Sequence, residues 1–542
     1  MTESNRALIN LNGNEETISN IDFTSVVNIT YTENVVLEKK KVVFQKCIFR
    51  QGIVFMIDLT QTKISELDLM FEDCIIEENK EKNEIKSNKQ KQKLFLYFNT
   101  CLIRDLGLDK CDFTNASFFK SLILERLLIT NSSVRIITIR NCFGSVFINN
   151  NPKSKLFIYY ADDNLFIENY NLRKVNKLIK KRDSLNKIFS HKTRFHISNT
   201  QEISVEFKKS SENGIKRIKN EDKSLKEAKY YLKESELKEL DISVSIRLES
   251  DITKNIKISN CILNGLSLNG DSNTIIDIKH TTCNRLFIDK FSSAKLLLYD
   301  FQATKEDSKL EIKNSDLSNT WFNKVRLNSF DIVSFYRTTL ENTKFSATEF
   351  PNSIEALENI HYPLEKESEY FNNQYENYKQ LKVALANQSD QIQALQMHRK
   401  MYEAIRQSKK LSSQDKFILF LNNISNKHGT SITHSFFCFL VILFSLYITY
   451  TLALPKAPYS FGWNGFGSFW ESICETTNFV LNKWKNLYAL ANPTHRLSQL
   501  IENNLGQELS GMNYFISFCS RILIGWCYYQ FVSAFRKFGK KV

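Results

Sequence analysis

The sequence predicts a mainly β solenoid, followed by an α-helical hairpin and a two-helix transmembrane region. Three observations support this order of parts. Large apolar residues recur at intervals of five in the first two thirds of the 542 residues. Helical periodicity lies on both sides of a short polar break at 387–390. Two apolar runs near the C-terminus are each long enough to cross a bilayer, which takes about 20 residues.

The predicted solenoid covers residues 1–350 and rests on apolar residues spaced by five. Three runs show this spacing: Phe44, Phe49, Val54, Leu59, Ile64 and Leu69; Ile103, Leu108, Phe113, Phe118, Ile123 and Leu128; and Leu317, Phe322, Leu327 and Ile332. The spacing fits neither a helix, with a period of about 3.6, nor a strand, with a period of about two. An amphipathic helix or a two-sided sheet therefore does not account for it.

A small residue often lies two positions before the large one. Examples are the pairs Cys47 and Phe49, Cys101 and Ile103, Cys111 and Phe113, and Ser315 and Leu317. This pairing is typical of a chain that turns a corner about every five residues and directs one bulky and one small side chain into a narrow interior.

The segments KCDFTNASFFKS (110–121) and NSDLSNTWFNKVRLNSFDI (314–332) resemble the pentapeptide-repeat family. The resemblance implies a right-handed, four-sided β-helix with about 20 residues per coil and coils about 4.8 Å apart. The runs differ in register, so we expect insertions, and a Lys-rich irregular region at about 151–251 shows no fives. A leucine-rich repeat is the alternative fold, because LFLYFNTCLI (94–103) also fits its core pattern.

Seven of the eleven cysteines lie in the predicted solenoid: Cys47, Cys74, Cys101, Cys111, Cys142, Cys261 and Cys283. None is part of a C-x-x-C pair, so we expect buried thiols rather than a metal site. The sequence predicts no metal and no cofactor.

Residues 351–427 are predicted to connect the solenoid to the membrane. A linker bracketed by Pro351 and Pro363 precedes a helical hairpin at 375–406 that resembles the tetratricopeptide type, with His398 as a packing residue. An amphipathic helix then begins at Lys416, and we expect it in the cytosolic headgroup layer.

The membrane domain is predicted at 428–542, with spans at about 433–455 and 513–535 and an extracytoplasmic or re-entrant segment at 456–512. Basic residues flank the spans on the side of the termini, whereas charges balance between the spans. We therefore expect the protein in the inner (plasma) membrane, with both termini in the cytosol. Residues 1–19 lack the apolar core of a secretory signal, which agrees with this expectation. The expected cytosolic surface anchors are Lys416, Lys427, Arg536, Lys537, Lys540 and Lys541.

The order of parts, with NNISNKHG (422–429) and YYQFVSAFRKFGKK (528–541), resembles a group of bacterial membrane proteins. These proteins join pentapeptide repeats to a C-terminal two-span module that has been likened to ion channels. The resemblance implies a channel-like membrane module but no particular ion.

Arg521 interrupts the second predicted span and shares one helical face with Ser517, Gly525 and Tyr528. A charge at the centre of a span costs about 2.5–3.5 kcal/mol on insertion scales, so three interpretations stay open. The arginine extends to the outer headgroups, packs between helices or lines a pore. Glu471 and Glu475, one helical turn apart, are either a cation-attracting ring or a solvated helix face.

Two functions are compatible with these features. The first is an oligomeric, channel-like or membrane-permeabilising protein controlled by a cytosolic solenoid. The alternative is a membrane-anchored scaffold that presents the solenoid to a cytosolic protein partner.

The net charge of +14 comes largely from Lys-rich runs, typical of solvated loops or of lipid contacts rather than of nucleic-acid binding. Phosphate-binding glycine loops and catalytic signatures are missing from the sequence, so an enzyme is not expected.

Overall fold

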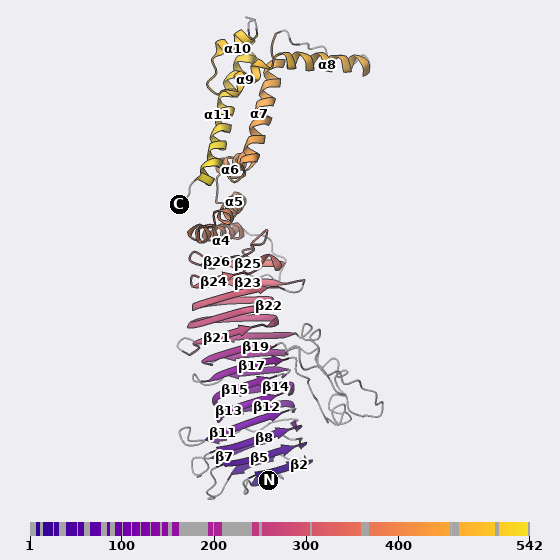
Figure 1. The fold of residues 1–542 in the computed structure, drawn as a ribbon, viewed down its shortest axis with the longest axis vertical. Coiled ribbons are helices and arrows are strands. Elements are labelled where there is room, and N and C mark those ends of the chain that lie inside the picture. The colour runs from indigo at the N-terminus through magenta and orange to yellow at the C-terminus, as the bar shows by residue number, and fades with distance from the viewer. Residues whose placement is uncertain are drawn as a thin grey trace. The chain divides into compact units, whose positions relative to one another are not determined.

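The computed structural model describes two compact units, Met1–Pro363 and Leu364–Val542 (Figure 1). The described residues are 7–10, 15–24, 27–31, 39–50, 53–58, 66–76, 84–86, 93–99, 101–109, 111–119, 121–130, 132–140, 142, 144–149, 154–161, 193–198, 200–208, 241–248, 252–303, 306–358, 368–408, 410–455, 457, 466–504 and 509–539.

The first unit is a β-solenoid of parallel strands, as the sequence predicts. One series of paired strands comprises β2 (Glu15–Ser19), β5 (Lys39–Gln45), β8 (Glu66–Glu72), β11 (Lys93–Asn99), β13 (Asp112–Phe119), β15 (Ser133–Arg140), β17 (Lys155–Ala161), β19 (Glu202–Lys208), β21 (Asn255–Ser259), β22 (Ile262–Gln302), β23 (Lys309–Lys313) and β25 (Ile332–Tyr336).

A second series runs beside the first and also includes β22. Its other members are β3 (Asp22–Phe23), β6 (Ile48–Phe49), β9 (Ile75–Ile76), β12 (Leu102–Asp109), β14 (Leu122–Thr130), β16 (Ser145–Asn149), β18 (Thr193–Ser198), β20 (Ile242–Arg247), β24 (Thr320–Asn323) and β26 (Lys344–Ser346). A shorter third series contains β1 (Ala7–Asn10), β4 (Val27–Tyr31), β7 (Ile53–Asp58) and β10 (Glu84–Lys86), and a 3₁₀ turn, η1, covers Leu327–Ser329.

The length of a coil varies along the solenoid. One coil takes 20 residues where Leu102 pairs with Leu122, and 27 where Glu66 pairs with Lys93. Strands β17, β18, β19 and β20 lie within the range 151–251, so the solenoid continues through the segment in which the sequence shows no fives. The stretches 162–192 and 209–240 of that range lie outside the described residues.

The five-residue spacing marks corners rather than whole coils. Phe71 ends the inward pattern of β8, Asp73 has a φ of 52°, Cys74 is buried, and Ile76 is the next large inward residue. Along β8 itself, buried and half-buried residues alternate, which is the period of two expected for a strand. The expectation that neither an amphipathic helix nor a two-sided sheet accounts for the spacing agrees with this solenoid, in which strands with a period of two are joined at corners.

Small side chains at the corners bind the backbone of the neighbouring coil. Cys74 Sγ donates to the carbonyl of Phe44 at 3.2 Å, and Thr338 Oγ1 donates to the carbonyl of Ile312 at 3.1 Å. Buried carbonyls need such donors where the chain leaves the strand ladder. Burial raises the pKa of the Cys142 and Cys283 thiols to about 12, so they act as small neutral side chains.

Stacked aromatic rings fill the interior between the corners. The rings of Phe44, Phe71, Phe98 and Phe118 follow one another through consecutive coils with centroids 4.9 Å apart. Because each coil repeats at the strand spacing, the same position of each coil presents a ring to the next.

The second unit is helical. Its elements are α4 (Ser368–Asn387), α5 (Gln391–Gln407), α6 (Ser413–Asn426), α7 (Ile432–Leu452), α8 (Phe466–Asn482), α9 (Lys485–Ala491), α10 (Leu497–Asn503) and α11 (Gly511–Gly539). Helices α4 and α5 form the hairpin that the sequence predicts, and the Asp390 side chain caps α5 by accepting from the Gln393 N–H at 3.1 Å. His398 is a packing residue there, with its ring 4.8 Å from that of Tyr402.

Among the described helices, only α7 is long and apolar enough to cross a membrane by length and composition. The second predicted span coincides with α11, which packs beside α7 (Figure 1) but carries polar residues along its length. A single apolar helix also occurs in the core of soluble proteins. The distribution of polar side chains in the helical unit is therefore a better indicator of a membrane location than the length of α7.

Candidate functional site

A helical hairpin between α7 and α11 is the candidate functional site. Helices α9 and α10 are joined by a turn at Asn492–Arg496. Their outer ends lie side by side, because the Asn486 and Asn504 amides there bond each other at 3.3 and 3.4 Å. Asn503 Nδ2 also donates to the Lys485 carbonyl at 3.2 Å. We call α9, the turn and α10 the inserted hairpin.

Local sequence explains the turn. Asn492 Oδ1 accepts from the Thr494 N–H at 3.0 Å and from its hydroxyl at 2.8 Å, which is the side-chain turn that asparagine favours. Pro493 follows Asn492 and does not continue α9. We call Asn492–His495 the hairpin tip.

The inserted hairpin shares an apolar core with both long helices. Ala489, Leu490 and Leu500 of the hairpin belong to one cluster with Leu443, Tyr447 and Tyr450 of α7 and Ile516 and Ile524 of α11. The Tyr447 hydroxyl donates to the Val480 carbonyl at the end of α8. The hairpin is thus part of the packing of the helix pair.

His495 fastens the hairpin tip to α11. Its Nδ1 lies 2.8 Å from the Asn492 carbonyl, and its Nε2 lies 2.9 Å from the Ser517 hydroxyl. A carbonyl only accepts, so Nδ1 carries a proton, and in the neutral ring Nε2 accepts from the Ser517 hydroxyl. Arg521 Nη2 donates to the carbonyl of His495 at 2.9 Å and completes the attachment.

The four residues predicted to share one face of the second span all lie along this attachment. Ser517 and Arg521 bond His495, and Gly525 lies beside Pro493, with 3.9 Å between the proline Cβ and the position of a Cβ on the glycine. Tyr528 borders a groove of about 470 Å³ together with Tyr488, Ala491, Asn492 and Pro493. The face therefore packs against the hairpin of its own chain.

Glu471 and Glu475 are not brought to this site. Both are exposed on α8, which joins the shared core only near its C-terminal end through Phe479 and Val480. Figure 1 shows the rest of α8 running away from α7. A solvated helix face is consistent with this position.

The predicted surface anchors gather near α6 and the end of α11. Lys416 is half-buried on α6, Lys427 ends that helix with a φ of 48°, and Arg536 and Lys537 lie in the last turns of α11. Lys540 and Lys541 lie outside the described residues.

Helix α6 is held to α11 through amides. Asn426 Nδ2 donates to Gln530 Oε1, and Gln530 Nε2 donates to Asn422 Oδ1 at 3.0 Å. The opposite face of α6 exposes Phe417, Ile418, Phe420 and Ile424. The apolar face expected at a membrane surface is thus directed away from the helical unit.

Sequence reasoning missed His495, Asn492 and the Asn486–Asn504 pair. The Asn492–Pro493 dipeptide was an available signal for a turn, because both residues favour turns. The paired asparagines leave no local signal, since they meet only when the hairpin closes.

Ser517 and His495 have the spacing of a nucleophile and its base, which sequence alone does not show. Each side chain is only 2% exposed, so a substrate carbonyl does not reach Ser517 Oγ. No group of three potential metal ligands occurs among the described residues.

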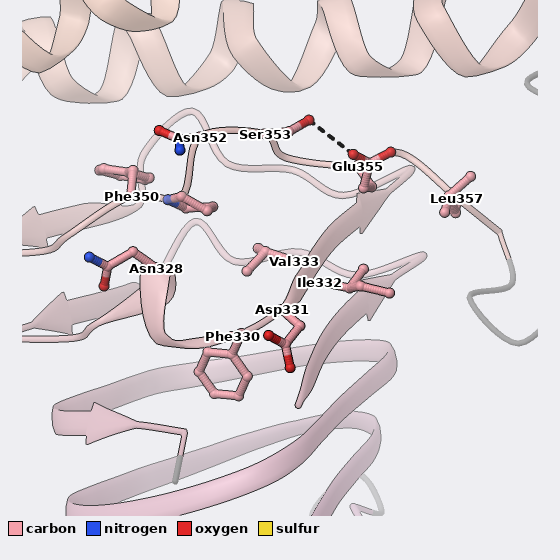
Figure 2. A pocket seen from close by; sticks show the side chains of 11 residues that line it. Asn328, Phe330, Asp331, Ile332, Val333, Phe350, Asn352, Ser353, Glu355 and Leu357 are labelled. Atoms are coloured by element: carbon pink, nitrogen blue, oxygen red, sulfur yellow. Dashed lines mark hydrogen bonds between the residues drawn. The ribbon is translucent and has the colours of Figure 1, made fainter. Parts of the chain in front are cut away.

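A second hollow lies at the last coils of the solenoid (Figure 2). It has a volume of about 810 Å³, and its lining includes Asn328, Phe330, Asp331 and Glu355. Asp331 Oδ2 accepts from the Ser308 N–H at 2.9 Å, and Glu355 Oε1 accepts from the Ser353 hydroxyl at 2.9 Å. Both carboxylates thus bond to the solenoid itself.

No family model, curated protein or solved structure matches this chain. The resemblances to the pentapeptide-repeat family and to the bacterial membrane group therefore stay predictions from the sequence.

Proposed function

We propose that this protein is a two-pass integral membrane protein in which α7 and α11 cross the inner membrane and both termini face the cytosol. The observation that supports this proposal is the reversed polarity of the helical unit. Among the described residues, 24 large apolar side chains are exposed in the helical unit and three in the solenoid. Water disfavours such a surface, whereas lipid does not.

The interior of the helical unit supports the same proposal. Polar residues of α11 are buried, including Asn513, Ser517, Ser520 and Gln530, while Phe515, Phe518, Ile522 and Tyr529 are exposed. Polar residues that bond between helices and an apolar exterior are expected in a bilayer. This pattern also explains why α11 is less apolar overall than α7.

The inserted hairpin is proposed to be re-entrant. At about 1.5 Å per residue, Ser517 and Gly525 lie about 9 and 21 Å along α11 from Gly511. The hairpin tip would then reach toward the middle of a hydrocarbon layer about 30 Å thick. Irregular backbone is tolerated at that depth where protein buries it or where it lines a water-filled cavity. His495 of the tip is buried against Ser517, whereas Asn492 and Thr494 are exposed and would face such a cavity.

Two crossing helices with a re-entrant segment between them follow the plan of two-helix channels. We therefore propose an oligomeric, channel-like protein whose pathway runs past the hairpin tip and whose cytosolic solenoid controls it. Two spans do not enclose a pathway within one chain, so the conduit requires several copies arranged with cyclic symmetry.

A membrane-anchored scaffold is the second candidate. It is favoured by the packing of Ser517 and Gly525, two residues of the predicted pore face, against His495 and Pro493 of the inserted hairpin. Under this alternative the helical unit only holds the solenoid at the membrane, and the hollow at Asn328–Leu357 would accept a cytosolic protein.

The pentapeptide-repeat relationship is also a proposal. It is supported by the last coils, where Leu340, Phe345 and Phe350 follow one another at intervals of five and buried threonines precede each by two positions. The long alternating strands of the N-terminal coils do not share this pattern.

Reconstitution of the full chain into vesicles tests the channel proposal. We expect an assembly of several copies in detergent and an ion flux across the vesicle membrane that scales with protein density. A chain that is monomeric in detergent and passes no ions in vesicles would rule out the conduit and leave the scaffold.

A further inference from the structure

We propose that the conduit selects small inorganic anions and that Arg521, held at the hairpin tip, is the selecting residue. This inference rests on the proposed channel function and adds the class of ion to it. It differs from the cation ring that Glu471 and Glu475 suggest from sequence.

Arg521 is the only Asp, Glu, Lys or Arg in α7 and in residues 511–535 of α11. A guanidinium at this depth is costly unless it faces water, a counter-ion or another polar group, at about 2.5–3.5 kcal/mol on insertion scales. Its position therefore requires a partner that the rest of the span does not supply.

The partner that the structure supplies is neutral and incomplete. Arg521 donates one hydrogen bond, to the His495 carbonyl, and makes no ion pair with a carboxylate of the described residues. A guanidinium has about five N–H donors, so most of them stay available. The side chain is exposed in a single copy, so these donors are accessible to a solute or a neighbouring copy.

The bond to His495 also fixes the direction of the guanidinium. An arginine that extends to the outer headgroups would leave the hairpin, whereas this one bonds the backbone of the tip. Ser517, one turn before Arg521, bonds the same histidine, so two successive turns of α11 are joined to the hairpin tip.

The hairpin contributes no negative charge near the tip. Residues 476–501 contain no Asp or Glu, and their charged residues are Lys483, Lys485 and Arg496. His495 adds no negative charge in either protonation state. A pathway along this surface has a positive potential, which concentrates anions and repels cations.

Ion selectivity of the reconstituted full chain tests the inference directly. With a KCl gradient across a bilayer of phosphatidylcholine, we expect the reversal potential to lie close to the chloride equilibrium potential. Arg521→Gln removes the charge and keeps a polar amide at this position, so we expect at least a tenfold loss of chloride over potassium selectivity.

Matched variants separate charge from folding. Arg521→Lys keeps the charge and is expected to retain anion preference. Glu471→Gln/Glu475→Gln removes the acidic pair of α8, which lies outside the hairpin, and should leave the preference within twofold. The assembly size in detergent verifies that each variant folds.

The outcomes distinguish the inference from the channel proposal. Absence of any current from the wild-type chain overturns the channel and the inference together. A cation-selective current, or unchanged anion selectivity in a correctly assembled Arg521→Gln, overturns the inference and leaves the channel. Anion preference only in bilayers with added anionic lipid would assign the guanidinium to lipid phosphate and also overturn it.

Discussion

The solenoid and the helical unit differ in the side chains that they expose and in the kind of polar side chain that they bury. Both units enclose apolar side chains, but the buried polar residues of the solenoid are mostly serines and threonines, whereas those of the helical unit include asparagines, glutamines and histidines. Large apolar side chains are exposed mainly on the helical unit, and the proposed membrane location accounts for this difference.

Hydrogen bonds differ in the same way. In the solenoid, buried side-chain donors bind backbone carbonyls of the neighbouring coil, as Thr338 and Cys74 do. In the helical unit, side chains also bond side chains of other helices, as Asn426 and Gln530 or His495 and Ser517 do. The first arrangement satisfies carbonyls between neighbouring coils, and the second joins one helix to another, as the proposed membrane location requires.

The largest expected effect comes from the aromatic column. Phe71 is fully buried between Phe44 and Phe98, so Phe71→Ala should lower the free energy of unfolding of the solenoid by about 3–5 kcal/mol. Denaturant unfolding of the strands, followed by circular dichroism of the full chain in detergent, measures this loss. Phe518→Ala, on a 62% exposed side chain of α11, is the control; an equal loss there would contradict the reversed polarity.

A smaller effect is expected at the base of the inserted hairpin. Asn504→Leu removes the partner of the buried Asn486 amide and should destabilise the helical unit by about 1–2 kcal/mol. Unfolding of the helices in mixed micelles measures it. The exposed Asn478→Leu of α8 should have no such effect, and equal effects of the two changes would show that the base pair contributes nothing.

The corner bonds of the solenoid predict a loss of about 1 kcal/mol each. Thr338→Val keeps the shape but loses the bonds to the Ile312 and Tyr336 carbonyls. Thr339→Val changes the exposed neighbour and should leave stability unchanged. The difference between their denaturant midpoints gives the value of the bond, and no difference would contradict its role.

The smallest effect on stability is expected when an exposed side chain is replaced, and such replacements can compare the surroundings of the two units. Phe417→Trp on α6 and Phe147→Trp on the solenoid replace exposed phenylalanines and should change stability by less than about 0.5 kcal/mol. Lipids with brominated acyl chains should quench the emission that Phe417→Trp adds and not the emission that Phe147→Trp adds. Equal quenching at both positions would remove the distinction between the two surfaces.

The sequence predicted the solenoid from features that repeat locally. Phe71, Cys74 and Ile76 lie within one corner, so their spacing survives changes in coil length. The lengths of individual coils were not predictable from the corners. One coil takes 20 residues from Leu102 to Leu122, and another takes 27 from Glu66 to Lys93. The repeat at Leu340–Phe350 was missed, although threonine takes the small position there.

The sequence predicted the α11 face of the candidate site but not the hairpin that this face contacts. Helical spacing correctly grouped Ser517 with Arg521, because residues four apart share a helix face. What this face contacts was not predictable, since α9 and α10 have seven residues each, too few to show a helical period. The Asn486–Asn504 contact joins positions 18 residues apart and depends on the closed hairpin.

Labelling of Cys474 in intact spheroplasts tests most directly that the helical unit crosses a membrane. Of the eleven cysteines, only Cys474, on α8, is exposed. If α7 and α11 are both spans, a membrane-impermeant maleimide should label the wild-type chain without lysis, and Cys474→Ser should abolish the labelling. Labelling of Cys474 only after the cells are opened would contradict the two-pass arrangement and, with it, the lipid-facing surface of the helices.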